Sequence, residues 1–556
     1  GGGGSSSSPP PGGQPPVQPP EPNEPVDPNN PPPGEGKAAF ACGSGGATLT
    51  ADDAPDSYVL FESAPVRPLA WSRDGSKLLV TNTPANCLEI YAVEEAGFSL
   101  LGTVMVGLDP VAVAFADDDE AWVVNHLSDS VSVVDLNGIP RVTRTLLVGD
   151  EPRDVVFAGP GGNRAFITAA YRGQNHPQFH PDDLIRPGLG RADVWVYDRE
   201  QLDDSLNGNP LAIVRLFADS PRALAVSGDG ATVYAAAFMS GNDTTSLSQD
   251  VVLESKPPPV DNVEGVEQPD TGLIVKKIDG SWRDESGTDW SAAVRFDLPD
   301  LDVFAIDAMA DVPVITRRQS GVGTVLFNMA VDPQSGELFV SNLEALNQIR
   351  FEGPGETATT VRGRIAESRI SVINGSGVIT NHLNPHIDFD VEEGHTYPQN
   401  LVEQSLSQPN SMVFSPDGSL LYVAAFGSGK VAAIPTQQLR TGSYEPNASL
   451  HAEVPGGGPS GLALSADGNR LVVYTRFDNA ISLLDTRSGE TLAHRPLFSP
   501  EPAEIIGGRK FLYDARETSA NGTSACSSCH IFADMDQLAW DLGNPDGLME
   551  ENPNRY

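Results

Sequence analysis

The chain has 556 residues, in which 75 aspartates and glutamates outnumber 35 lysines and arginines and give a formal net charge of −40. This balance excludes a protein that binds the phosphate backbone of nucleic acids, because such proteins present clustered cations. Hydrophobic residues make up 39% of the chain, enough for a large core. No run of residues approaches the roughly 18 consecutive apolar positions of a membrane-spanning helix. We therefore expect a folded protein that is soluble or tethered rather than embedded.

The N-terminal residues 1–37 consist largely of proline, glycine and serine. Such a segment cannot bury enough apolar surface to offset its ordering entropy, so we expect a disordered, semi-extended tether. A Gly/Ser run followed by proline-rich sequence resembles the start of a bacterial lipoprotein just after its lipid-bearing cysteine, which would precede Gly1. A secreted protein trimmed by a signal peptidase is the alternative. Both predict export, to the periplasm or to the outer membrane or cell surface of a bacterium, with a lipid anchor as the only membrane attachment.

The central part of the chain repeats a Ser-x-Asp-Gly tetrad between two apolar runs. An Asp-Gly pair supplies backbone positions with positive φ for a tight turn, so each tetrad predicts a β-hairpin. A third, alternating β-branched strand and a more polar fourth strand complete the unit, as at 130–135 and 141–148. The four tetrads begin at Ser72, Ser227, Ser415 and Ser465.

Four antiparallel strands repeated every ~40 to 50 residues are typical of a β-propeller blade. Insertions at 172–191 and about 240–299 should emerge on one rim of the propeller, where loops commonly bind partners; solvated loops without a ligand are the alternative. The repeat predicts an all-β fold with about seven blades over residues 38–500, which start near Pro68, Pro110, Arg153, Pro221, Gly323, Ser411 and Ser460.

The phrases Val123–Asp135 and Leu338–Asn342 resemble the YVTN-type β-propeller repeat family. The resemblance covers roughly residues 58–497 and implies the same fold as the repeat period does. Propellers of this type serve as adhesins, binding platforms and enzyme scaffolds, so the fold does not select a function.

Near the C-terminus, residues 526–530 have the Cys-x-x-Cys-His pattern of covalent c-type haem attachment. In this chemistry Cys526 and Cys529 form thioethers with the porphyrin vinyl groups, and His530 binds the iron from the proximal side. A redox-active disulfide would require a βαβ context and a zinc site four ligands, and the flanking sequence offers neither. We therefore expect one covalent haem c in this chain, within a short, mainly helical segment at 501–556.

The residues around the motif resemble the first haem segment of di-haem cytochrome c peroxidases and MauG relatives. The resemblance covers about 501–547 and implies a second haem-binding motif further on, which this sequence does not contain. Only 26 residues follow His530. We therefore expect either a longer native polypeptide or a haem pocket completed by another surface, which allows for an oligomer formed through this segment. The resembling residues are 508–515, Gly522, 531–534 and 538–547.

The sequence does not determine the distal iron ligand. Met535 should share a helix with the proximal histidine and cannot easily reach the opposite haem face, so Met549 is the better internal candidate. Each candidate also fits an ordinary packing or surface role. A strong sixth ligand would indicate electron transfer, whereas an open position would permit peroxide or oxygen chemistry. The alternative to Met549 is a histidine of the propeller, namely His382, His386 or His395.

Two weaker patterns remain. Cys42 and Cys87 predict a disulfide between the end of the tether and the first blade, with free burial as the alternative. The segment Asn381–Asp390 could bind a cation through carboxylates and imidazoles. No recognised calcium-loop spacing appears in it, so loop solvation is the preferred interpretation.

Together these features predict an exported c-type haem protein in electron transfer. The acidic propeller would be its scaffold or docking platform for a redox partner such as a basic cytochrome. The enzyme alternative is a peroxidase-like or MauG-like oxidoreductase whose second haem lies outside this chain and whose catalytic residues are unassigned. The third hypothesis is a cell-surface binding or assembly module in which the haem is structural.

Overall fold

The computed structural model describes residues 42, 43, 45, 59, 60, 62–178, 180–255, 272–284, 286–349, 364–391 and 396–540. The predicted tether at 1–37 and two of the candidate iron ligands, His395 and Met549, lie outside these residues. By its internal contacts the chain divides into two units, Gly1–Ala41 and Cys42–Tyr556, and all elements described below belong to the second. None of the helices in the described part is long and apolar enough to span a membrane.

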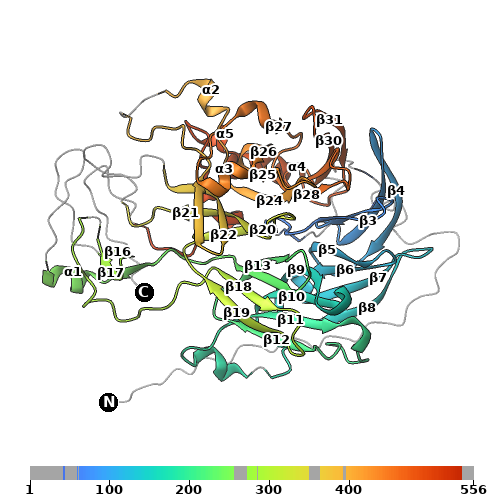
Figure 1. The fold of residues 1–556 in the computed structure, drawn as a ribbon, viewed down its shortest axis with the longest axis horizontal. Coiled ribbons are helices and arrows are strands. Elements are labelled where there is room, and N and C mark those ends of the chain that lie inside the picture. Colours follow the sequence, from blue (N-terminus) through green and yellow to red (C-terminus); the bar gives the residue numbers. More distant parts are fainter. Residues whose placement is uncertain are drawn as a thin grey trace, which may run out of the picture. The chain divides into compact units, whose positions relative to one another are not determined.

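Seven four-stranded antiparallel sheets contain 28 of the 31 strands of the described residues (Figure 1). The predicted mostly-β fold is thus confirmed. The first three sheets are β1–β4 (Leu69–Trp71, Leu78–Asn82, Cys87–Glu94, Gly97–Met105), β5–β8 (Pro110–Asp117, Glu120–Asn125, Ser130–Asp135, Arg141–Leu147) and β9–β12 (Asp150–Ala158, Arg164–Tyr171, Ala192–Asp198, Ala212–Leu216). The fourth sheet is β13, β14, β18 and β19 (Pro221–Val226, Thr232–Ala237, Val303–Asp307, Val314–Gln319). The last three are β20–β23 (Val325–Val331, Leu338–Ala345, Ala366–Asn374, Gly377–His382), β24–β27 (Pro409–Phe414, Leu420–Ala425, Lys430–Pro435, His451–Glu453) and β28–β31 (Pro459–Leu464, Arg470–Thr475, Ala480–Asp485, Thr491–Pro496).

The first strands of the seven sheets contact one another in a closed cycle, in which β28 of the last sheet meets β1 of the first. Seven clusters of buried hydrophobic side chains fill the interfaces between neighbouring sheets. The period of two along a strand explains this packing. In β6, Trp122 and Val124 face the third sheet, whereas Ala121 and Val123 face the first. Sheets that are buried on both faces and joined in a cycle are the architecture of a β-propeller.

The tetrads form the turns between first and second strands. In the sixth sheet Ser415 Oγ donates to Asp417 Oδ1 at 2.6 Å, and the same carboxylate oxygen accepts from Ser419 N at 3.0 Å. The hydroxyl of Ser415 also accepts from Leu420 N at 3.0 Å. Gly418 has a φ of +71°, but Asp417 does not lie in the left-handed region. The expectation that both residues of Asp-Gly adopt positive φ is therefore wrong: only glycine does, and the aspartate instead ties the turn together. The equivalent bonds recur at Ser72, Ser227 and Ser465.

These turns should make the protein sensitive to acid. Hydrogen bonds from Ser415 and Ser419 lower the pKa of Asp417 to about 2. A carboxylate whose folded pKa lies below its unfolded value of ~3.9 stabilises the fold above that value and loses this contribution as pH falls toward 2. We expect Asp417→Asn to lower the Tm at pH 7 and to flatten the fall in Tm between pH 4 and pH 2. Thermal unfolding from pH 2 to 7 measures this.

The matched control is Asp311→Asn, since Asp311 is exposed. An equal change of pH slope in both variants would show that the tetrad carboxylate has no special part in acid unfolding.

Each first strand begins, and each second strand ends, on one side of the sheets, which we call the entry face; the tetrad turns lie on the opposite side. Both long insertions connect a second to a third strand, β10 to β11 and β14 to β18, so both emerge on the entry face.

The second insertion is more than a solvated loop. It contains α1 (Gln249–Ser255) and a three-stranded sheet, β15–β17 (Thr244–Leu247, Leu273–Ile278, Ser281–Arg283), with a small core around Trp282 and Trp290. The short helices α2 (Gln399–Val402) and α3 (Thr436–Thr441) lie in connections of the fifth and sixth sheets.

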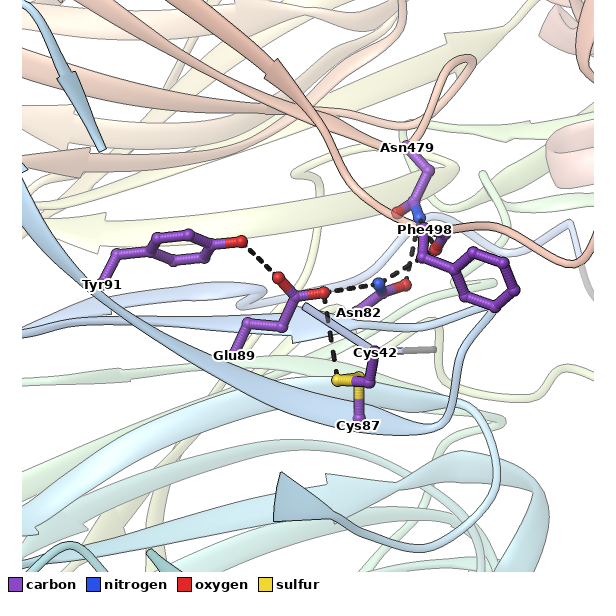
Figure 2. Close-up of a disulfide and its surroundings, with 7 residues drawn as sticks. All are labelled: Cys42, Asn82, Cys87, Glu89, Tyr91, Asn479 and Phe498. Carbon is purple, nitrogen blue, oxygen red and sulfur yellow. Dashed lines mark hydrogen bonds between the residues drawn. A yellow bond between two sulfur atoms is a disulfide. The ribbon is translucent and has the colours of Figure 1, made fainter. Parts of the chain in front are cut away.

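Polar side chains close the interface between the first and last sheets (Figure 2). Asn479 Nδ2 donates to Asn82 Oδ1 at 3.0 Å, and both amides donate to the carbonyl of Phe498 at 3.0 Å. Asn82 also donates to the buried Glu89 carboxylate at 2.7 Å. Beside this network, Cys42 and Cys87 form a disulfide. The disulfide therefore attaches the residues before the first sheet to the place where the cycle of sheets closes.

Candidate functional site

The Cys-x-x-Cys-His motif lies in a C-terminal segment that packs on the entry face. After β31 the chain forms α4 (Ala503–Tyr513) and α5 (Ala515–Thr518), and the motif begins with a 3-10 turn at Cys526–Ser528. The backbone N–H groups of Cys529 and His530 both donate to the carbonyl of Cys526, at 3.3 and 3.0 Å. This turn keeps the two cysteines and the histidine on one compact stretch of backbone.

Both cysteines of the motif are free; Cys526 is exposed and Cys529 is partly buried. Burial, together with the nearby Asp536 and Cys526, raises the pKa of the Cys529 thiol to about 12. Reactive dithiols depend on a thiol whose pKa is lowered. The raised pKa keeps the Cys529 thiol protonated near neutral pH, so Cys529 is not an activated thiol. A thioether has no thiol proton to lose, so the same surroundings suit covalent attachment of a haem.

The geometry also argues against zinc. Among the described residues, the only three His, Cys, Asp or Glu side chains with ligand atoms all within 4.8 Å of one another are Cys42, Cys87 and Glu89, and these cysteines are disulfide-bonded. The motif residues do not converge in this way, although a tetrahedral zinc site requires it. Thioether attachment instead places the two sulfurs at separate vinyl groups, and the exposed His530 leaves its imidazole accessible. The donor set fits haem c.

Hydrogen bonds fasten the motif to the start of the sixth sheet. Gln408 Nε2 donates to the Ser527 carbonyl at 2.5 Å, and Ser527 Oγ donates back to Gln408 Oε1 at 3.0 Å. Nearby, Ser405 Oγ donates to the carbonyl of Asn521 at 2.7 Å. Ser527 lies between the two cysteines and is fully buried. The turn between the two thiols is therefore held against the propeller rather than projecting from it.

Phe532 anchors the segment from the other side of the motif. Its ring enters a hydrophobic cluster shared by the fourth to seventh sheets, with centroid separations of 5.9, 5.8 and 5.6 Å to Phe238, Phe327 and Phe426. The buried guanidinium of Arg222 lies 5.0 Å from the same ring centroid. Phe532 has a φ of +50°, which is costly for a residue other than glycine. Burial of the aromatic ring must therefore stabilise this backbone conformation.

A buried ion pair fixes α4. Arg509 Nη1 and Nη2 donate to the two carboxylate oxygens of Glu501 at 2.8 and 2.6 Å, and Nη2 also donates to Glu62 at 2.9 Å. Tyr513 Oη donates to Glu62 at 3.1 Å. Burial opposes the charge of Arg509, but the two carboxylates outweigh it and raise its pKa. Since Glu62 precedes the first sheet, this network joins both ends of the described unit.

We expect Phe532→Ala to release the C-terminal segment without unfolding the propeller. Removing a buried phenylalanine ring costs about 3 kcal/mol, which corresponds to roughly a hundredfold increase in the population of the released segment. Limited proteolysis, with cleavage sites mapped by mass spectrometry, should show faster cutting within 501–540. Met535→Ala is the control, since Met535 is 53% exposed. Equal protection of both variants would exclude Phe532 as the anchor.

One expectation about the distal side is wrong. Met535 does not share a helix with His530. The chain after His530 forms only a short 3-10 turn, Ile531–Ala533, and the backbone of Phe532 and Ala533 is left-handed. The signal missed in the sequence was the absence of a helix-favouring pattern beyond the motif. Met535 is exposed and packs on no described core.

The propeller histidines already have partners. His386 Nε2 lies 3.0 Å from the carbonyl of Leu401, so this nitrogen carries the proton and donates it. His382 lies against the Phe389 ring, and burial lowers its pKa to about 4. The described residues of Asn381–Asp390 contain no converging group of metal ligands. His386 Nδ1 is buried as well, so neither nitrogen of the His386 ring is accessible to iron in this structure.

Comparisons with known proteins support the fold alone. No protein-family model and no curated protein matches the chain. Among solved structures it is similar to hydrazine synthase of Kuenenia stuttgartiensis, with a TM-score of 0.51 and 18% sequence identity over 78% of this chain and 98% of that chain. A functionally unknown protein from Desulfotomaculum acetoxidans (TM-score 0.42, 15% identity, 76% and 99% covered) and apo AztD from Citrobacter koseri (TM-score 0.34, 12% identity, 78% and 88% covered) are more distant. The resemblances to YVTN-type repeats and to di-haem peroxidases remain predictions.

Proposed function

We propose that this chain is an exported, seven-bladed propeller protein that carries one c-type haem and takes part in electron transfer. The observation that carries the proposal is the arrangement of the motif. Two free thiols and an accessible imidazole follow one another on a turn that is hydrogen-bonded to Gln408 and anchored by Phe532. Cys526 and Cys529 would hold the porphyrin, and His530 would be the proximal ligand. When bound, the haem supplies one-electron redox chemistry.

The exposure of the motif explains why covalent attachment is needed. Cys526 and His530 are exposed, so the described part of the chain covers little of any group held there. Two thioether bonds retain the cofactor where burial does not. The same exposure leaves an edge through which electrons can pass to a partner. A pocket completed by a second surface, from a partner or a second copy, is compatible with this arrangement.

The disulfide and the net charge support the proposed compartment and the proposed partner. The disulfide between Cys42 and Cys87 supports an oxidising compartment, and therefore export to the periplasm or cell surface. The net charge of −40 favours a basic partner, such as a basic cytochrome, through electrostatic steering. Steering of this kind weakens as added salt shortens the screening length.

The decisive experiment is a spectrum and an intact mass of material purified from the native host or matured together with a cytochrome c assembly system. We expect one haem per chain in a pyridine haemochrome assay and a mass increased by one covalent haem. A colourless protein in which Cys526 and Cys529 can both be alkylated would overturn the proposal. Two haems, together with peroxide turnover, would instead establish the peroxidase-like or MauG-like enzyme.

A kinetic measurement then separates electron transfer from a structural haem. The reduced protein is mixed with an oxidised basic cytochrome and with an oxidised acidic cytochrome of similar potential. We expect faster oxidation by the basic partner, with a rate that falls as salt is added. Failure to exchange electrons with either cytochrome would favour the binding or assembly module with a structural haem.

A further inference from the structure

A two-part cleft lies on the entry face between the third and fourth sheets. Its charged half, with a volume of about 780 Å³, is lined by Asp150, Tyr171, Arg172, Arg191, Asp219 and Gln537. Its apolar half has a volume of about 550 Å³ and is lined mainly by apolar residues, with the exposed Arg186 among them. The large apolar residues are Ile185, Leu189, Phe217, Met239, Leu298 and Leu301. Both volumes are of the size that binds small molecules. The walls come largely from the two insertions and the ends of neighbouring strands.

The two halves share a boundary that carries both signs of charge. Arg191 and Asp219 line the charged half and the apolar half alike. The charged half is also lined by a second cation, Arg172, and a second anion, Asp150. The formal charges of these four side chains cancel. A purely anionic ligand would meet two carboxylates there, and a purely cationic ligand would meet two guanidinium groups.

Arg172 is held in a fixed position. Only 3% of its surface is exposed, and it lines the charged half of the cleft. Its Nη2 donates to the carbonyl of Gly190, and its Nε lies 3.5 Å from the buried carboxylate of Asp193. A guanidinium whose position is fixed by other protein groups is suited to bind a carboxylate through parallel hydrogen bonds.

Nearby positive charges do not fully offset the cost of burying the Asp150 and Asp219 carboxylates. Burial raises the pKa of Asp219, and burial together with Asp129 and Glu151 raises the pKa of Asp150. Both shifts mean that the surroundings disfavour the charged carboxylates. A bound ammonium group would favour these charged forms. Asp150 and Asp219 are therefore suited to bind a primary ammonium group. The two arginines of the cleft are suited to bind a carboxylate.

We propose that this cleft binds a free α-amino acid with a large apolar side chain. The carboxylate would contact Arg172 and Arg191, the ammonium would contact Asp150 and Asp219, and the side chain would extend into the apolar half. Gln537 also lines the charged half and lies seven residues after His530. Ligand binding would therefore take place beside the C-terminal segment. The proposal is independent of the haem.

Isothermal titration of the full chain with L-leucine and L-phenylalanine tests the proposal. Three probes each remove one feature: 4-methylpentanoate lacks the ammonium, 3-methylbutylamine lacks the carboxylate, and glycine lacks the apolar side chain. We expect the two amino acids to bind and each probe to bind at least about tenfold more weakly. No binding of either amino acid, or equal binding of a probe that lacks one charge, would overturn the proposal.

Variants locate the site. Arg191→Gln and Asp219→Asn should each weaken leucine binding by about tenfold or more, because each leaves a ligand charge without its partner. Arg191 is exposed and Asp219 is half-buried, so neither change removes a core residue. Arg141→Gln, on the outer strand β8, is the matched control and should bind leucine as the unaltered chain does. Unchanged affinity in both cleft variants would place any amino-acid binding elsewhere and refute the assignment.

Discussion

Replacing Cys526 and Cys529 together by alanine is expected to yield a folded propeller without covalent haem. Cys526 is exposed and Cys529 only partly buried, so the substitutions remove little of the packing that holds the segment. The anchors at Gln408 and Phe532 do not involve either sulfur. Under conditions in which the unaltered chain acquires haem, the double variant should lose the visible absorbance of haem and should show the mass of the bare polypeptide.

The matched control for this prediction is Ser528→Ala. Ser528 lies within the same turn, and its hydroxyl accepts only from Ala525 N at 3.1 Å. The Cys-x-x-Cys-His pattern is intact in this variant, so haem attachment should persist. Covalent haem in the double cysteine variant, or its loss in both variants, would show that the motif does not direct attachment.

Removing the disulfide is expected to cause the largest loss of stability. Cys42 and Cys87 are 45 residues apart in sequence, and the loop-entropy model gives about 4 kcal/mol for a loop of this length. The bond also lies beside the Asn82 and Asn479 contacts that close the cycle of sheets (Figure 2). Cys42→Ser with Cys87→Ser should lower the urea midpoint at constant protein concentration.

Chemical reduction provides the comparison. The unaltered chain with reductant should unfold at the same midpoint as the double serine variant, and reductant should not change that variant further. A loss below about 1 kcal/mol would contradict the prediction and would mean that the unfolded chain is already restrained near these residues.

Much of the fold could be predicted because the relevant signals are local. A period of two in the sequence indicates a strand, and a glycine indicates a tight turn. The seven predicted unit starts therefore lie within three residues of the starts of the observed first strands. The turn chemistry was assigned only in part. Asp417 was expected in a left-handed conformation, whereas it acts through hydrogen bonds that reach across the tetrad from Ser415 to Ser419.

The candidate site, too, could be predicted from the sequence only in part. The candidate residues Cys526, Cys529 and His530 could be picked from the sequence, because the Cys-x-x-Cys-His pattern is defined by short-range spacing. The residues that position them were not found. Gln408 precedes Ser527 by 119 residues, and Arg222 is more than 300 residues from Phe532. Nothing in the local pattern of these side chains distinguishes them from other polar or aromatic residues.

The amino-acid pattern by itself determined a mostly-β repeat protein of acidic composition with a Cys-x-x-Cys-His motif, because strand periodicity, turn glycines and motif spacing act over a few residues. Only the tertiary structure decided which sheets adjoin and where the motif rests. It also decided that the two insertions meet in a charged and apolar cleft on the same face. These arrangements depend on packing between segments tens to hundreds of residues apart, where shape and burial select the partner and short-range sequence does not.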